Sequence, residues 1–206
     1  MYSANTINTT EKLVCGDVYH VYNKAVGSEL LFRTSLDYEY FLKKMSRFIL
    51  PIANIYAYCL IPNHFHVLLK LKQSEEIPQL SKIDEERYPE FLLTTFGNFF
   101  NSYSKSYNKK YERHGRLFVQ PFKRKSVEDD DYFIVLVNYI HRNPLHHGLV
   151  KHYGLWKYSS YSAYLIESPS QLSRKEVLDY FKSPTEFIDY HEENRVKPGM
   201  EALYLE

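Results

Sequence analysis

Two histidines one residue apart are the first candidates for chemistry in this sequence. His64 and His66 lie in residues 60–71, an apolar stretch entered from a Pro-Asn turn and too short to favour a helix, so we expect a buried strand. Side chains alternate across a strand, which would place both imidazoles on one face and Phe65 on the other. Two neutral imidazoles close together form half of a site for a divalent metal.

A later apolar helix carries residue types that would complete such a site. Tyr139 and Asn143 are four residues apart and share a face of the predicted helix. If this face looks toward the strand, His64, His66 and the Asn143 side-chain oxygen would ligate a metal and leave positions for phosphate oxygens and water. Tyr139 would then attack phosphorus in line, giving a phosphotyrosine bond and a free 3′ hydroxyl.

Each of these residues also has an ordinary structural interpretation. The chain holds 20 tyrosines, and a tyrosine in an apolar helix is usually part of the core. Asn143 precedes Pro144, which we expect to end the helix, so it could simply be a helix-end residue. His141 is a candidate accessory proton carrier or substitute ligand. From the residues alone, a metal site and an ordinary core both stay open.

The order of the predicted elements specifies how these residues would be positioned. The sequence predicts strand, helix, strand, strand, helix, strand, which is the split βαβ or ferredoxin-like pattern, an α+β fold with an antiparallel sheet and helices on one face. A third long helix follows the pattern. The strands are expected at 17–26, 52–60, 64–71 and 117–127, and the helices at 35–50, 90–110 and 132–143.

The length favours one domain with additions. Residues 1–16 are interpreted as a polar N-terminal tail, residues 17–150 as the nuclease-like domain and residues 151–206 as an accessory C-terminal extension of short helices. Within this extension, Trp156 and residues 159–164 are the expected packing anchors.

The charge of the chain is segregated although the formal net charge is only +1. Residues 105–125 hold eight basic residues against one acidic residue and are interleaved with tyrosine and phenylalanine, a composition typical of surfaces that grip a nucleic-acid backbone and stack on bases. Residues 167–206 hold five basic and nine acidic residues, which argues against DNA contact there. The basic stretch could instead be a solvated helix face and loop.

The remaining composition excludes several other classes of protein. Two cysteines without Cys-x-x-Cys spacing indicate neither a disulfide framework nor a zinc knuckle. The first residues are polar, and no stretch reaches the length of a membrane span, so no membrane partner is expected. A cytoplasmic, reduced setting follows as the default.

Five blocks of residues, in this order, resemble the REP-associated tyrosine transposases of the single-tyrosine superfamily of HUH nucleases, in which two histidines flank one bulky apolar residue. The blocks run from about residue 17 to 165, and no motif follows them. They are Tyr19-His20-Val21-Tyr22-Asn23; Ile61-Pro62-Asn63-His64-Phe65-His66-Val67-Leu68; Gly115-Arg116-Leu117-Phe118 with Phe122-Lys123; Tyr139-Ile140-His141-Arg142-Asn143-Pro144 with Gly148-Leu149-Val150; and Trp156-Lys157-Tyr158-Ser159-Ser160-Tyr161.

The resemblance implies a ferredoxin-like nuclease domain that nicks and rejoins single-stranded DNA near hairpins with Mg²⁺ or Mn²⁺. Carried over by position, His64 and His66 match the metal-binding pair, Tyr139 the nucleophile and Asn143 the third ligand. The hairpin-binding residues are less well fixed by motif. We expect phosphate contacts foremost from Arg116, Lys123 and Arg124, and also from Lys109, Lys110 and Arg113.

Two other functions compete with this expectation. The same sheet and basic stretch could hold hairpin DNA or RNA without cleaving it, although this would not explain why the histidine pair, the tyrosine and the asparagine occur together. A zinc hydrolase is disfavoured because no third His, Glu or Cys lies at the usual spacing. Whether the tyrosine comes from the same chain or from a second copy in a homodimer stays open.

Overall fold

The computed structural model describes residues 10–193, so residues 1–9 of the predicted tail and 194–206 of the predicted extension lie outside it. Four strands form a sheet in the order β2-β3-β1-β4, with every neighbouring pair antiparallel. Their bounds are β1 Val18–Lys24, β2 Ala53–Ile61, β3 His64–Leu71 and β4 Lys123–Ser126. Since β1 and β2 flank β3, the predicted split βαβ, ferredoxin-like fold is confirmed.

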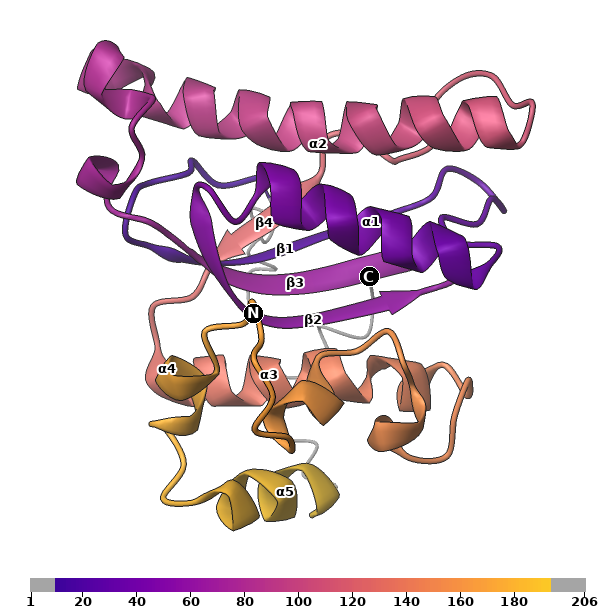
Figure 1. The fold of residues 1–206 in the computed structure, drawn as a ribbon, viewed down its shortest axis with the longest axis vertical. Coiled ribbons are helices and arrows are strands. Elements are labelled where there is room, and N and C mark those ends of the chain that lie inside the picture. Colours follow the sequence, from indigo (N-terminus) through magenta and orange to yellow (C-terminus); the bar gives the residue numbers. More distant parts are fainter. Residues whose placement is uncertain (1–9, 194–206) are drawn as a thin grey trace, which may run out of the picture.

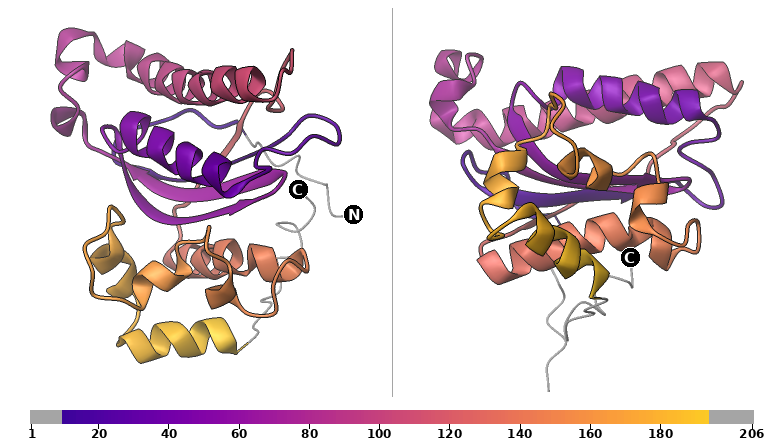
Figure 2. Two further views of the ribbon diagram at one scale, coloured as in Figure 1. Left: turned by 45° about the vertical axis from the view of Figure 1, so that its right-hand side comes forward. Right: turned by 60° about the horizontal axis from the view of Figure 1, so that its bottom comes forward.

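The helices form layers on the two faces of this sheet (Figures 1 and 2). α1 (Ser35–Phe48) and α2 (Tyr88–Lys110) cover one face, as the split βαβ pattern requires. α3 (Asp130–His146) lies on the opposite face, together with the short helices α4 (Arg174–Leu178) and α5 (Pro184–Glu192). No helix within residues 10–193 is both long and apolar enough to cross a membrane.

Strand alternation divides the core into two clusters. Phe65 on β3 points toward α1 and α2, where its ring lies 5.1 Å from that of Phe41 and 5.8 Å from that of Phe100. The neighbouring apolar side chains of β2 and β3 point the other way and pack against Leu136 and Ile140 of α3. The sheet is therefore buried on both faces, and any polar side chain on the α3 face must find a partner there.

α3 is longer than the sequence predicts. It begins after Asp129, whose carboxylate accepts a first-turn backbone N–H at 2.7 Å, and it continues past Asn143 to His146. The expected end at Asn143 is wrong because Pro144 lies in the last turn, where its missing N–H removes a single helical hydrogen bond. Gly148 then leaves the helix with φ of 65°. Asn143 thus lies inside the helix with a fixed direction.

The fourth strand is shorter than the predicted span of residues 117–127. Regular pairing is confined to Lys123–Ser126, while Phe118 makes only an isolated bridge with Ala25. Pro121 explains part of the difference, because it has no N–H to donate to a ladder. The shortened β4 is the edge of the sheet, and Thr10 bridges its Arg124 from outside.

The extension packs on β2 and α3. Trp156 donates its indole N–H to the Leu60 carbonyl at 2.8 Å, and the hydroxyl of Tyr164 donates to the carbonyl of Tyr56. Ser159 forms a bridge with Cys59. These contacts confirm Trp156 and residues 159–164 as packing anchors.

Candidate active site

β3 places the two histidines at the end of the sheet where β1 finishes and α3 passes. His66 faces α3 and is 2% exposed, whereas His64, the first residue of the strand, is half-buried. In the antiparallel ladder His64 lies opposite Lys24, and His66 lies opposite Tyr22. Phe65 points to the other face, as alternation predicts.

α3 brings the predicted tyrosine and asparagine to the same place. Asn143 Oδ1 lies 3.0 Å from His64 Nε2. One turn earlier, the Tyr139 ring meets the His66 ring edge-on, with centroids 5.3 Å apart and planes at 84°. The structure therefore brings His64, His66, Tyr139 and Asn143 together within one chain, while their roles stay predictions.

His64 is placed between two amide oxygens and can donate to only one of them. Its Nδ1 lies 2.9 Å from Asn63 Oδ1, and its Nε2 lies 3.0 Å from Asn143 Oδ1. Burial, and then the neighbouring His147, lower the pKa of His64 to about 4. The ring is therefore neutral at pH 7 and carries a single proton. With that proton directed to Asn63, lone pairs face each other across the gap to Asn143.

This arrangement fits a divalent cation. Two ligands at right angles around an ion roughly 2.1 Å from each lie about 3 Å apart, which is the spacing between His64 and Asn143. Rotation of the Asn143 amide would place its NH₂ group on the same nitrogen, so the gap accepts either an amide proton or a cation. Within residues 10–193 no group of three or more His, Cys, Asp and Glu is arranged to hold a metal, so an amide oxygen would have to complete the set.

His20 is a further member of this cluster and is not among the site residues predicted from the sequence. His20 lies on β1, almost fully buried, with Nε2 2.9 Å from Nδ1 of His66. The alternation in His20-Val21-Tyr22 predicts that the rings of His20 and Tyr22 lie on the same face of β1. Because β1 pairs with β3, this face places both rings next to His66. Burial depresses the pKa of His20 to about 3 and holds the pKa of His66 well below its usual range, so both rings are neutral.

Tyr139 is buried where it stands. Its side chain is 2% exposed and packs in the apolar cluster between α3 and the sheet, with its ring edge-on to both His20 and His66. A phosphate can reach its hydroxyl only if the groups that cover it move. The tyrosine is therefore adjacent to the histidine pair but not open to a substrate in this arrangement.

The structure contradicts the accessory role considered for His141. This residue is fully buried on the opposite side of α3, where Nδ1 lies 2.9 Å from His191 Nε2 and Nε2 lies 2.8 Å from Ser160 Oγ. Two helical residues two positions apart point in nearly opposite directions. Because Tyr139 and Asn143 face the sheet, His141 faces the extension and cannot serve the site.

Arg124 is likewise a correction to the expected phosphate contacts. It is 8% exposed, and its guanidinium donates to the backbone carbonyls of Glu11 at 2.5 Å, Thr10 at 3.1 Å and Phe122 at 3.4 Å. Its neighbour on β1 is Val21, so it points to the α1–α2 face. Arg124 fastens the first described residues to the sheet edge and presents no free N–H fork to a phosphate.

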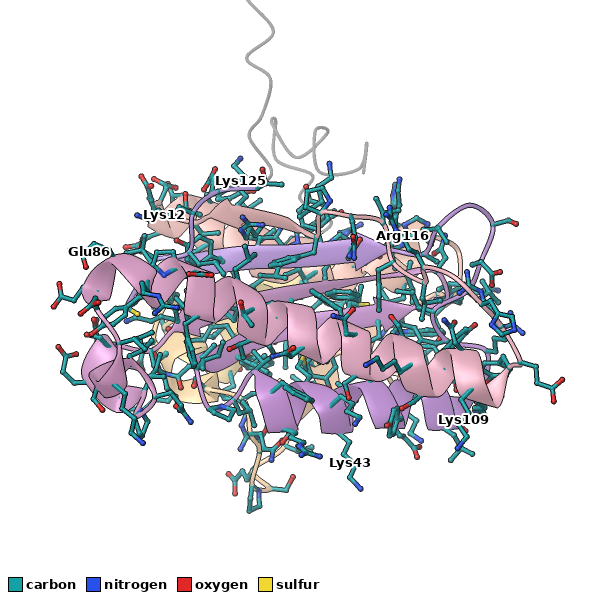
Figure 3. All side chains as sticks on the ribbon, turned by 90° about the horizontal axis from the view of Figure 1, so that it is seen from above. Lys12, Lys43, Glu86, Lys109, Arg116 and Lys125 are labelled. Carbon is teal, nitrogen blue, oxygen red and sulfur yellow. The ribbon has the colours of Figure 1, made fainter. Side chains whose placement is uncertain are left out.

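Two further members of the predicted basic surface already have partners. Lys110 forms an ion pair with Asp37 of α1 at 2.7 Å. Arg113 lies 3.0 Å from a Glu29 carboxylate oxygen and donates to Asn108 at 2.9 Å. Lys109 is exposed at the C-terminal end of α2 (Figure 3). The basic stretch is thus divided between structural and exposed residues.

Arg116 and Lys123 lie in or next to segments that pair with β1, the strand beside the histidines. Arg116 is exposed beside residues 117–118, which contact residues 25–26 next to Lys24, opposite His64. Figure 3 shows Arg116 on the β4 side of α2. Lys123 lies opposite Tyr22 in the ladder and therefore shares the face of His20 and His66. Lys24 contributes to the lowered pKa of His64 and was missed as a candidate cation.

Comparisons with known proteins show what this chain is similar to. No known family model matches the chain. A protein of Haemophilus influenzae named as a REP-associated tyrosine transposase is 27% identical over 108 residues, which are 51% of this chain and 57% of that relative. The chain thus matches a little over half of the relative's length.

A solved structure of a REP-associated tyrosine transposase bound to a REP hairpin superimposes with a TM-score of 0.57. The match covers 78% of this chain and 87% of the other, at 15% identity, and so concerns the fold alone. Taken together, the relative and the fold confirm the resemblance indicated by the sequence motifs: this chain is similar to the REP-associated tyrosine transposases.

Proposed function

We propose that this protein is a metal-dependent single-strand DNA transesterase that nicks and rejoins DNA at hairpin or palindromic sequences. The observation that carries the proposal is the convergence of a neutral His64 nitrogen and the Asn143 oxygen at 3.0 Å, next to His66 and Tyr139. The named relative and the hairpin-bound structure support DNA as the substrate. The proposed setting is the cytoplasm, at the nucleoid when the protein is bound to DNA.

The residues have distinct proposed tasks. His64, His66 and Asn143 would hold Mg²⁺ or Mn²⁺, which when bound polarises a phosphate and favours the phenolate of tyrosine. The Tyr139 oxygen forms a bond to phosphorus as the bond to the 3′ oxygen breaks, so the phosphate stays esterified as a 5′-phosphotyrosine and the 3′ oxygen takes a proton. Reversal by a 3′ hydroxyl rejoins the strand, and no nucleotide cofactor is needed.

The cations near the site would position the DNA backbone. Arg116, Lys24 and Lys123 lie at or beside the sheet end that carries His64, on elements held together by the β1 ladders. Contacts of this kind to phosphates fix register without reading sequence. Lys109, exposed at the end of α2, would extend the contact along a hairpin stem.

A hairpin-binding module without cleavage is the second candidate, and the burial of Tyr139 favours it. In that case the basic residues hold the hairpin, and the histidine cluster is only part of the core. The two functions differ in one product: only the transesterase forms a covalent link between protein and DNA.

We therefore expect the protein to form a denaturant-resistant adduct when it is incubated with Mn²⁺ and a labelled hairpin that carries a single-stranded extension. Tyr139→Phe should reduce the adduct at least about a thousand-fold, because the nucleophile is lost, and should leave hairpin affinity unchanged. Denaturing gels measure the adduct and fluorescence anisotropy measures the affinity.

Tyr132→Phe is the matched control, since it removes a hydroxyl from the first turn of the same helix. Undiminished adduct in Tyr139→Phe would place the nucleophile elsewhere, and binding without any adduct would favour the second candidate. Mixing His66→Ala with Tyr139→Phe tests whether a second copy in a homodimer supplies the tyrosine, because adduct restored by the mixture requires a tyrosine from the other chain.

A further inference from the structure

His20 supports His66 from the neighbouring strand and has no other visible function. Its Nε2 lies 2.9 Å from His66 Nδ1, and the two rings are nearly parallel, with centroids 5.1 Å apart. Tyr22 stacks on His20 at 4.7 Å, and Tyr139 closes the pair edge-on at 6.3 Å. The His20–His66 contact is thus enclosed, and its geometry is fixed by β1, β3 and α3 together.

The contact allows only two arrangements of protons. Two imidazole nitrogens 2.9 Å apart form a hydrogen bond, which places a single proton between them, and a neutral imidazole carries its one proton on only one of its two nitrogens. If His66 donates it from Nδ1, the Nε2 of His66 keeps a lone pair that can bind a metal. If His20 donates, His66 must carry its own proton on Nε2 and has no nitrogen left for a ligand.

We propose that His20 is a positioning residue that holds His66 in the Nδ1–H tautomer and thereby directs the His66 Nε2 lone pair to the metal. The inference rests on the proposed metal site and goes beyond it, because it assigns a task to a residue that touches neither metal nor substrate. Partners of this kind orient a histidine ligand and raise its basicity, and their loss lowers metal affinity roughly ten- to a hundred-fold.

Two substitutions separate this task from simple packing. His20→Phe keeps an aromatic ring to stack on Tyr22 and His66 but removes the acceptor. His20→Gln loses the ring but retains an amide oxygen that can accept from His66 Nδ1. A packing role predicts that phenylalanine is the milder change, whereas the positioning role predicts that glutamine is.

The test uses the full chain without DNA, with Mn²⁺ as the probe. We expect His20→Phe to weaken Mn²⁺ binding about ten-fold or more, measured by calorimetry or by the electron paramagnetic resonance of free Mn²⁺, while His20→Gln stays within about three-fold of the wild type. Urea unfolding controls for stability. In the metal-free wild type, ¹⁵N-edited NMR of the His66 ring should show a proton on Nδ1 and an unprotonated Nε2.

Mn²⁺ affinity unchanged in His20→Phe, or lowered equally in both variants, would overturn the inference. So would NMR spectra that place the His66 proton on Nε2. The proposed function fails differently: if wild-type protein with the Nδ1–H tautomer does not bind Mn²⁺, the metal site is wrong although His20 fixes the ring. If Mn²⁺ binds and the tautomer is the other one, the metal site stands and the role of His20 does not.

Discussion

One histidine cluster lies on each side of α3: His141 and His191 behind the helix, and His20, His64 and His66 between the helix and the sheet. The two clusters differ in whether there are enough N–H and O–H protons to give every hydrogen-bond acceptor a donor. Behind the helix, Ser160 can donate to His141, His141 to His191, and His191 to the Phe187 carbonyl, at 2.8, 2.9 and 2.8 Å. Every ring nitrogen in this series of hydrogen bonds has a partner when both histidines are neutral. On the sheet side, the neutral His64 faces two oxygens with one proton.

This difference shows how a structural histidine can be distinguished from a candidate ligand. Both clusters are buried, and burial lowers the histidine pKa values in both. Neither burial nor a shifted pKa therefore distinguishes them. Counting the available protons against the acceptors distinguishes them. In the series behind α3 every acceptor already has a donor. Where two acceptors face each other, a cation must bind between them or a proton must move.

The largest expected effect comes from removing a proposed metal ligand from the cluster on the sheet side of α3. His66→Ala should weaken Mn²⁺ binding by more than about a hundred-fold, beyond what the loss of a supporting partner produces, and should abolish the DNA adduct. Calorimetry measures the first effect and denaturing gels the second. Mn²⁺ affinity retained in this variant would remove His66 from the site.

His141→Ala should have the opposite profile. It leaves the His191 Nε2 acceptor without its partner, removes one contact of the Ser160 hydroxyl and opens a cavity, so we expect a loss of about 2–4 kcal/mol in the free energy of unfolding. Mn²⁺ affinity, measured on folded protein, should change less than about three-fold. Urea denaturation gives the first value, and a stable variant that no longer binds Mn²⁺ would show that the two clusters are coupled.

Acid should destabilise the protein through both clusters. In the folded chain the pKa of His191 and that of His64 are lowered to about 4, so these rings are neutral between pH 4 and 6.5, where the unfolded chain binds protons. Stability should therefore be complete above about pH 6.5 and fall below it, by roughly 1.4 kcal/mol per pH unit for each histidine.

Replacing one histidine by a residue that does not titrate measures how much that histidine contributes to the pH dependence of the unfolding free energy. His191→Gln should lower the pH slope of the unfolding free energy by about one histidine's share. Added Mn²⁺ should stabilise this variant as much as it stabilises the wild type, because the proposed metal site lies in the other cluster. A slope that does not change would mean that His191 is not neutral in the folded state.

The smallest effect is expected for Ser160, the first donor in the series of hydrogen bonds behind α3. Ser160→Ala removes the hydrogen bond to His141 at 2.8 Å and should reduce the unfolding free energy by about 1 kcal/mol. Mn²⁺ binding should not change. A loss much larger than that of His141→Ala would indicate that the other contacts of Ser160, to the backbone of Tyr58, dominate.

The fold was predictable because local patterns and connections agree. Alternation placed Phe65 and His66 on opposite faces, and helical spacing placed Tyr139 and Asn143 on one side of α3. The order of elements then implied that β1 and β2 flank β3. What could not be read was the end of α3, because a proline in a last turn costs only one hydrogen bond.

The candidate site was only partly predictable, because a residue type does not reveal which partner it will find. Arg124 was indistinguishable in sequence from Lys123, but adjacent residues of a strand point to opposite faces, and only Arg124 reaches the carbonyls of Thr10 and Glu11. His20 was overlooked because its neighbour His66 becomes adjacent only across the ladder between β1 and β3. His141 was a candidate accessory residue only because it lies between Tyr139 and Asn143 in the sequence.

The two-sided character of α3 has a consequence for how much of the chain forms one working unit. The helix that offers Asn143 to the sheet is gripped from behind by His191 and by the Tyr190 carbonyl, which accepts from Asn138 at 3.4 Å. Contacts with the sheet and contacts with α5 thus together fix the rotation of α3 about its own axis. Sequence changes in residues 151–193 that shift α3 would therefore alter the spacing between His64 and Asn143, so the packing of this segment helps to set the geometry of the candidate site.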